Sequence, residues 1–119
     1  GCRKQTPPEW EFPAHVAPVG LVFYQGSLLP LRYQNQLFVA EHGSWNRTVP
    51  QGYRLVVIRF KEGKPVSESV MVEGWLSSDG MVLGRPVDVL ELKDGSVLIS
   101  DDFADVIYRL TPKQNGTFP

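Results

Sequence analysis

The densest set of reactive side chains in this sequence lies in one run, Glu41–Thr48, between two apolar segments. The run reads Glu-His-Gly-Ser-Trp-Asn-Arg-Thr, so a carboxylate, an imidazole, a hydroxyl and a guanidinium follow one another closely along the chain. Connections between strands carry function more often than the strands themselves. Alternatively, these residues are polar only because a long loop is exposed to solvent, and Trp45 covers an apolar edge of the sheet. Both interpretations stay open on the residues alone.

A hydrolase site is disfavoured within this run. Neighbouring residues of an extended chain point to opposite faces, which separates the side chain of Glu41 from that of His42. Ser44 also lacks the Gly-x-Ser-x-Gly context of a nucleophile elbow. A serine hydrolase needs its hydroxyl, imidazole and carboxylate to converge, so the sequence does not predict that reaction.

The sequence assigns no metal ligand either. Asp101, Asp102 and Asp105 bring together the oxygen ligands that calcium prefers. Their spacing does not match the EF-hand loop, and Asp pairs at the end of a strand more often cap a turn. His15 and His42 lie far apart and form no zinc-binding motif. We therefore expect the aspartates to stabilise a turn.

Short apolar runs, separated by 10 Pro and 11 Gly spread along the chain, must position these residues. No segment carries a sustained apolar stripe at helical spacing. Gly63 and Gly95 each follow a charged pair, where a tight antiparallel turn needs a positive φ. The pattern predicts an all-β meander. Its predicted strands are Ala17–Tyr24, Gln36–Glu41, Tyr53–Phe60, Glu68–Glu73, Pro86–Leu92, Ser96–Ser100 and Val106–Leu110.

A weak internal repeat organises these strands. Three blocks of the first half recur in the same order in the second half. The matching pairs are Ala17–Val22 with Arg85–Leu90, Leu37–His42 with Val97–Asp102, and Tyr53–Ile58 with Val106–Leu110. Four-stranded antiparallel units in series are the blades of a β-propeller. We therefore predict an extended N-terminal arm over residues 1–13 and a domain of about two propeller blades over residues 14–119.

This partial propeller needs something to complete it. The second unit lacks a fourth strand, which Trp10–Phe12 or another chain would supply. Two blades cannot close a ring, because propellers typically have about four to eight. The chain is then a piece of a longer protein, one of several copies that assemble, such as three copies making six blades, or an open sheet derived from a propeller.

The composition excludes several classes of protein. At 119 residues the chain has room for one ordinary domain, and 42% hydrophobic residues are enough for a packed core. A formal net charge of -1 gives no basic surface for nucleic acid. No apolar run reaches the roughly 18 residues of a membrane span, and the chain shows no signal peptide. The single Cys2 excludes an internal disulfide, although Gly1-Cys2 also matches the start of a lipoprotein.

Five blocks of the sequence carry a family resemblance. They are Pro13–Tyr24, Leu37–Arg47, Gly52–Arg54, Gly84–Val89 and Asp94–Asp102. In order and spacing they resemble the C-terminal part of the glucose/sorbosone dehydrogenase family over residues 8–111. The resemblance implies a six-bladed β-propeller that is exported, as in the bacterial periplasm. It also implies oxidation of aldose sugars with pyrroloquinoline quinone (PQQ) and calcium.

The resemblance assigns cofactor contacts residue by residue. Arg85 matches the first of two family arginines that hold the carboxylates of PQQ, which suits a trianion in need of cationic partners. The second arginine position holds Val87. Arg47 lies near a family lysine that contacts the cofactor, and His15 lies where relatives place a polar contact. Each of these three residues has the alternative of a solvated or structural side chain.

The resemblance also sets a limit on activity. The blocks that carry the family's catalytic histidine and calcium loop do not occur in this chain, so we expect no sugar oxidation by the chain alone. Its status as an enzyme stays open. The alternative is a standalone two-blade module for carbohydrate binding, through Trp45 and Tyr53, or for assembly as a trimer or by strand exchange. A third alternative is a decayed gene product without function.

Overall fold

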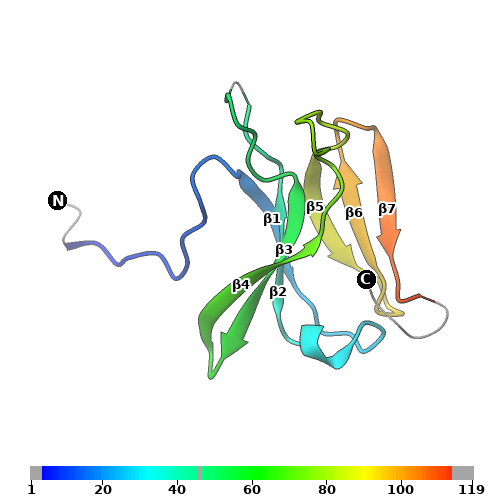
Figure 1. Cartoon of the computed structure of the whole chain (residues 1–119). Coiled ribbons are helices and arrows are strands. Elements are labelled where there is room, and N and C mark those ends of the chain that lie inside the picture. Colours follow the sequence, from blue (N-terminus) through cyan, green and yellow to red (C-terminus); the bar gives the residue numbers. More distant parts are fainter. Residues whose placement is uncertain (1–3, 46, 114–119) are drawn as a thin grey trace.

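The computed structural model describes residues 4–45 and 47–113 and is built from β-strands. Two antiparallel sheets lie side by side (Figure 1). The first has the order β1–β2–β3–β4 and the second the order β5–β6–β7. Their bounds are β1 Pro18–Phe23, β2 Leu37–Glu41, β3 Arg54–Lys61, β4 Lys64–Val72, β5 Pro86–Glu91, β6 Val97–Asp101 and β7 Val106–Leu110. Leu31–Tyr33 forms a short 3₁₀ turn.

The all-β prediction is confirmed, and each predicted strand is present. No α-helix occurs in the part of the chain that the structure describes, so that part also holds no helix able to cross a membrane. The main difference is the start of β4, which lies four residues before the predicted Glu68. Glu62 and Gly63 both have positive φ, 54° and 78°, and make a turn tight enough for Lys61 to pair directly with Lys64.

The predicted repeat is present in the strand pairing. Pro18 pairs with Glu41 in the first sheet, and Pro86 pairs with Asp101 at the equivalent place in the second. In both sheets the register shifts directly after the proline. The unit β1–β2–β3 and the unit β5–β6–β7 are therefore built alike, as expected for a partial propeller.

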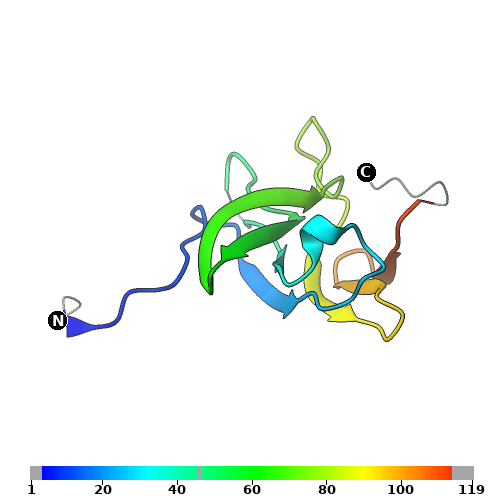
Figure 2. The ribbon, with the colours of Figure 1, turned by 90° about the horizontal axis from the view of Figure 1, so that it is seen from below.

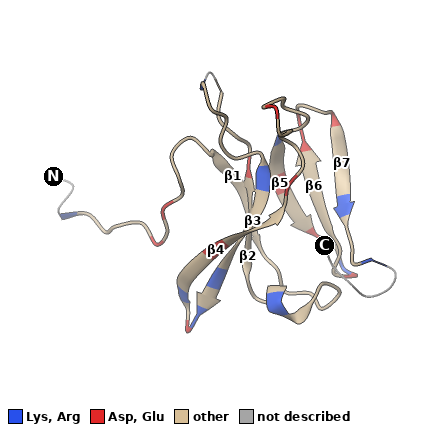
Figure 3. Ribbon diagram, in the orientation of Figure 1, with Lys and Arg blue, Asp and Glu red and all other residues tan. Residues whose placement is uncertain are grey.

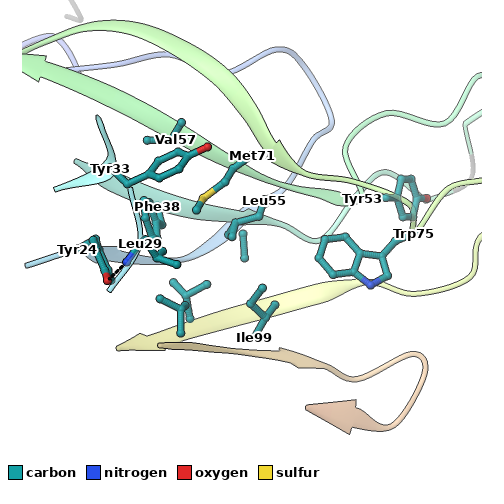
Figure 4. Packing of buried hydrophobic residues seen from close by; sticks show 13 residues of the cluster. Tyr24, Leu29, Tyr33, Phe38, Tyr53, Leu55, Val57, Met71, Trp75 and Ile99 are labelled. Carbon is teal, nitrogen blue, oxygen red and sulfur yellow. Dashed lines mark hydrogen bonds between the residues drawn. The ribbon is translucent and has the colours of Figure 1, made fainter. Parts of the chain in front are cut away.

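The two sheets lie next to each other in the view from below (Figure 2). The main hydrophobic core fills the space between them (Figure 4). Phe38 of β2 stacks on Tyr24, with ring centroids 5.2 Å apart, and both side chains are fully buried. Val97 and Ile99 of β6 close the core from the other side. Each such side chain contributes on the order of 1.5–3 kcal/mol by leaving water. The sheets approach each other closely at Gly20, where an added Cβ would lie 2.5 Å from the carbonyl oxygen of Val87.

Hydrogen bonds join the two sheets at the end opposite to the Glu41–Thr48 run. The buried hydroxyl of Tyr24 donates to the carbonyl of Gly95 at 2.6 Å and accepts from the amide of Leu29 at 3.0 Å. The amide of Gln25 donates to the Glu91 carboxylate at 2.7 Å. Residue 95, which the sequence placed in a turn, thus also anchors the neighbouring sheet.

The N-terminal arm covers part of the outer face of the first sheet. Trp10 and Phe12 pack against Val39, Val56 and Ile58, and the Trp10 indole donates to Glu68 of β4 at 2.9 Å. The arm forms no strand within residues 4–13. The prediction that Trp10–Phe12 supplies the fourth strand of the second blade is therefore wrong within this chain, because the arm's aromatic side chains pack, partly buried, on the first sheet. Strand exchange between chains stays a prediction.

Replacing Tyr24 by Phe tests the link between the sheets. Tyr24→Phe leaves the Leu29 amide and the Gly95 carbonyl without a partner in a buried place, so we expect a loss of about 1–3 kcal/mol in the free energy of unfolding. Urea denaturation measures it. The control Leu31→Ala removes an exposed side chain and should change stability little. A Tyr24→Phe loss no larger than that of Leu31→Ala contradicts the role given to this hydroxyl.

Candidate functional site

Arg85 joins the two sheets at the end that carries the polar run. It is half-buried at the entrance to β5. Its Nε donates to the carbonyl of His42 at 3.1 Å, and its Nη2 donates to the carbonyls of Gly43 at 2.8 Å and Ser44 at 3.2 Å. The guanidinium lies over the ring of Tyr53, 5.5 Å from the centroid. A residue predicted to hold a cofactor therefore also holds the polar run in place.

Asp101 in turn fixes the backbone of Arg85. One carboxylate oxygen accepts from the amides of Arg85, Phe103 and Ala104 at 2.9, 3.0 and 2.9 Å, and the other accepts from the Tyr108 hydroxyl at 2.7 Å. Burial disfavours the charged carboxylate, but these hydrogen bonds outweigh it and lower the pKa of Asp101. The predicted turn cap is confirmed for Asp101, whereas Asp102 pairs with His42. No group of three potential metal ligands occurs among the described residues.

His42 adds a second contact between the sheets. Its Nε2 lies 2.8 Å from the carboxylate of Asp102, which follows β6 as His42 follows β2. The imidazole is largely covered, whereas Asp102 is exposed. This pair occupies equivalent positions in the two units of the repeat.

A hollow of about 550 Å³ lies at the segment whose carbonyls accept from Arg85, although Arg85 itself is not one of its lining residues. It is lined by His15, Ala17, Gly43, Ser44 and Trp45. Trp45 is 80% exposed and offers a free indole face. The carbonyls of Gly43 and Ser44, to which Arg85 donates, belong to the same wall. The structure thus brings together two residues predicted from sequence, His15 and Trp45, and places Arg85 behind the wall that they share.

Two other predicted site residues, Arg47 and Tyr53, do not line this hollow. Arg47 is exposed and makes no hydrogen bond or ion pair with any described residue. Tyr53 is buried, its hydroxyl donates to the carbonyl of Ser44, and its ring lies under the Arg85 guanidinium. The ring of Tyr53 is therefore used inside the protein, and the carbohydrate contact of Trp45 and Tyr53 stays a prediction.

The sequence analysis missed an ion pair between two neighbouring strands. Arg54 Nε donates to an oxygen of Glu41 at 2.8 Å, where the residues face each other across β2 and β3. Glu41 is fully buried, and its other oxygen has no partner among the described residues. Burial raises the pKa of Glu41, the Arg54 guanidinium opposes that rise, and Glu68 adds to it. Opposite charges at the facing ends of two apolar runs were the signal in the sequence.

Replacing Asp101 by Asn tests the turn cap and its pH dependence. Because the folded pKa of Asp101 is lowered, its contribution to stability is present above the unfolded pKa of about 3.9 and is lost as pH falls through the folded value. We expect Asp101→Asn to cost about 1–3 kcal/mol at pH 7, with a smaller difference from the wild type near pH 3.

Urea denaturation at the two pH values measures this difference. The control Asp105→Asn changes an exposed carboxylate of the same turn that makes no hydrogen bond to a described residue. A difference between Asp101→Asn and the wild type that stays constant with pH contradicts the assignment.

Comparison with known proteins places this fold among sugar dehydrogenases. An uncharacterized protein of Borreliella burgdorferi is 43% identical over 109 residues, which is 90% of this chain and 29% of that protein. A pyrroloquinoline quinone-dependent pyranose dehydrogenase of Coprinopsis cinerea is 46% identical over 46 residues, or 39% of this chain and 6% of that protein. The chain thus spans less than a third of these relatives.

Solved structures agree with this placement. The holo form of the pyranose dehydrogenase PQQ domain from Coprinopsis cinerea has a TM-score of 0.61 and 28% identity, covering 82% of this chain and 27% of that one. A Trichoderma reesei structure of carbohydrate-active enzyme family AA12 has a TM-score of 0.64 and 23% identity, covering 81% and 25%, and supports the fold alone. The predicted resemblance to sugar dehydrogenases is confirmed, while the narrower glucose/sorbosone assignment stays a prediction. The TrAA12-like family model matches residues 1–81, and this sugar-dehydrogenase-like chain therefore belongs to the TrAA12-like family.

Proposed function

We propose that this chain forms one wall of the quinone site of a PQQ-dependent sugar oxidoreductase and does not oxidise sugars alone. The observation that carries the proposal is Arg85, a half-buried cation behind the wall of a hollow with an exposed indole at Trp45. The relatives named for PQQ and pyranose dehydrogenase support it. A glucose- or sorbosone-type aldose is the substrate class that the sequence resemblance favours, and export of the whole protein follows from the same resemblance.

The residues present fit one edge of such a cofactor. Nε and Nη2 of Arg85 serve three backbone carbonyls, whereas Nη1 makes no hydrogen bond to a described residue. One free N–H pair fits one carboxylate of a trianion, and His15 and Arg47 are the further donors that the sequence predicts. Trp45 offers a flat face for the ring. When bound, the quinone supplies the electron acceptor for sugar oxidation.

These residues do not complete a catalytic site. The imidazole of His42 is held by the Asp102 carboxylate. The oxygens of Asp101 accept from the amides of its own turn and from the Tyr108 hydroxyl. A base and the remaining cationic contacts must come from the part of the relatives that this chain does not span. Without them, proton removal at catalytic distance has no residue to perform it.

Titration of PQQ by calorimetry, with calcium present, tests the proposal. We expect weak binding by the full chain and a loss of roughly tenfold to a hundredfold in Arg85→Ala, the effect of one charge-assisted pair. Arg85→Lys keeps the charge and should retain more affinity than Arg85→Ala. The control Arg59→Ala removes an exposed cation of β3 and should bind as the wild type does.

Two results contradict the proposal. If Arg85→Ala binds PQQ as tightly as the wild type does, Arg85 does not contact the cofactor. If the chain oxidises glucose with an artificial electron acceptor, it does not need the sequence blocks that carry the family's catalytic histidine and calcium loop. Circular dichroism of each variant separates a loss of binding from a loss of fold.

A second role, self-association, is favoured by the outer faces of both sheets. Val19 and Leu21 of β1 are 54% and 63% exposed, and Leu90 and Ile107 of the second sheet are 58% and 68% exposed. By the repeat, the outer face of the second sheet is equivalent to the face with which the first sheet covers the core. A second copy could therefore pack there head to tail, and three copies would give six blades.

Deleting residues 1–12 tests the role of the arm in this assembly. The deletion exposes the apolar surface that Trp10 and Phe12 cover, so we expect a change in solution mass and a melting temperature lower by about 4 °C or more. Sedimentation and thermal denaturation measure both. Unchanged mass together with an unchanged melting temperature contradicts a structural role of the arm.

A further inference from the structure

The outer face of the second sheet repeats the buried face of the first sheet, layer by layer. A layer here means three residues that face one another across the first three strands of a unit. The corresponding layers are Gly20, Ala40 and Leu55 in the first sheet and Asp88, Ser100 and Ile107 in the second. The first layer faces the core, whereas Ile107 is 68% exposed and the neighbouring Leu90 is 58% exposed. The same surface is therefore buried in one unit and open in the other.

The buried face of the first sheet has no room for a side chain at Gly20. An added Cβ there would lie 2.5 Å from the carbonyl oxygen of Val87 and 2.6 Å from the Cα of Asp88. Both are backbone atoms of β5, which packs against β1 and β2 and cannot move aside as the end of a flexible side chain can. The spacing of the two sheets therefore requires glycine at residue 20.

Asp88 is the residue at which the second sheet does not meet this requirement. It follows Pro86 and the register shift of β5, as Gly20 follows Pro18 in β1. Because side chains alternate along a strand, Asp88 lies on the face opposite to the buried Val89. One carboxylate oxygen accepts from the Val89 amide at 2.9 Å, and the other makes no hydrogen bond to a described residue. A sheet packed as closely on this face would meet the Cβ of Asp88.

A second copy packed head to tail would present an unfavourable surface to Asp88. Since β1 and β5 correspond, Val19 and Gly20 of that copy would take the places of Val87 and Asp88 in the contact. The Asp88 carboxylate would then face the carbonyl of Val19, and neither group donates a hydrogen bond. Burying a carboxylate without a donor disfavours association. Size and charge at residue 88 therefore act in the same direction.

The other charged residue of this face leaves the contact more room. Arg109 pairs with Leu98 at the place where the first sheet has Val57. Its guanidinium is held at the turn before β6, by the Asp94 carboxylate at 2.6 Å and the Ser96 hydroxyl at 3.1 Å. A long side chain can keep its charged end at the rim of a contact, whereas a Cβ cannot leave the strand.

We infer that Asp88 limits head-to-tail packing of a second copy on the outer face of the second sheet, by occupying space that the second copy needs. The inference rests on the self-association proposed above, because it names the residue that sets its strength. Glycine at residue 88 would give this face the form that the first sheet has at Gly20. The packing of the two sheets within the chain shows the contact that glycine allows.

Sedimentation equilibrium of the full chain tests this inference through the dissociation constant between copies. We expect Asp88→Gly to lower that constant by about tenfold or more, because overfilling a close contact costs free energy on that scale. Asp88→Ala removes the carboxylate but keeps the Cβ, so it should stay near the wild type. The control Glu73→Gly removes an exposed carboxylate outside this face and should also stay near the wild type. Circular dichroism of each variant checks the fold.

The double variant Asp88→Gly with Leu90→Lys identifies the face that is used. Leu90 is exposed, so lysine is tolerated in the single chain, but a second copy on this face would bury the new charge. We expect the double variant to lose the gain in association that Asp88→Gly brings.

Three results overturn the inference. One is a dissociation constant that Asp88→Gly leaves unchanged. Another is an equal gain in Asp88→Ala, which would show that space at the Cβ does not decide the contact. The third is a gain that survives Leu90→Lys and therefore lies at another face. A wild type that associates as tightly as Asp88→Gly leaves self-association standing, whereas monomers in both cases contradict self-association as well.

Discussion

The guanidinium of Arg85 is the contact on which the candidate site depends. Arg85 directly precedes β5, the first strand of the second sheet. Its guanidinium donates to the carbonyls of three successive residues, 42–44, which follow β2 in the first sheet. The Asp101 carboxylate accepts a hydrogen bond from the backbone amide of Arg85 and so fixes its position. A planar donor fork suits this task because several acceptors can be satisfied from one rigid group. The wall of the hollow beside Trp45 is therefore fixed by contacts between the sheets and not by the loop itself.

The buried carboxylates of Glu41 and Asp101 occupy equivalent positions in the two units of the repeat but make different contacts. Asp101 is satisfied by four donors, and its pKa is lowered. Glu41 has one donor, Arg54, and its pKa is raised mainly by burial. The same place in the sheet thus stabilises a turn in one unit and positions a charged side chain in the other. Acidic and basic residues are interspersed over both sheets (Figure 3), so these differences are local and do not reflect a charged face.

The chain has the architecture of a partial propeller. It spans less than a third of the relatives it matches, and both sheets carry exposed apolar side chains on their outer faces. The arm covers some of that surface in the first sheet through Trp10 and Phe12. The proposed quinone-binding wall and the proposed interface for further blades are compatible on such a unit, because the wall lies in the connection after β2 and the exposed apolar side chains lie on the strands.

The sequence by itself determined the strands, their antiparallel order, the repeat and the turn cap at Asp101. Each of these follows from local features, namely alternating apolar residues, glycine at positive φ and a carboxylate beside the amides of its own turn. Only the tertiary structure decided that Tyr53 is buried, that Arg85 binds carbonyls, that Glu41 is left half-satisfied and that the arm lies on a sheet face. These depend on how the two sheets approach each other, and contacts between residues far apart in the chain leave no periodic pattern in the sequence.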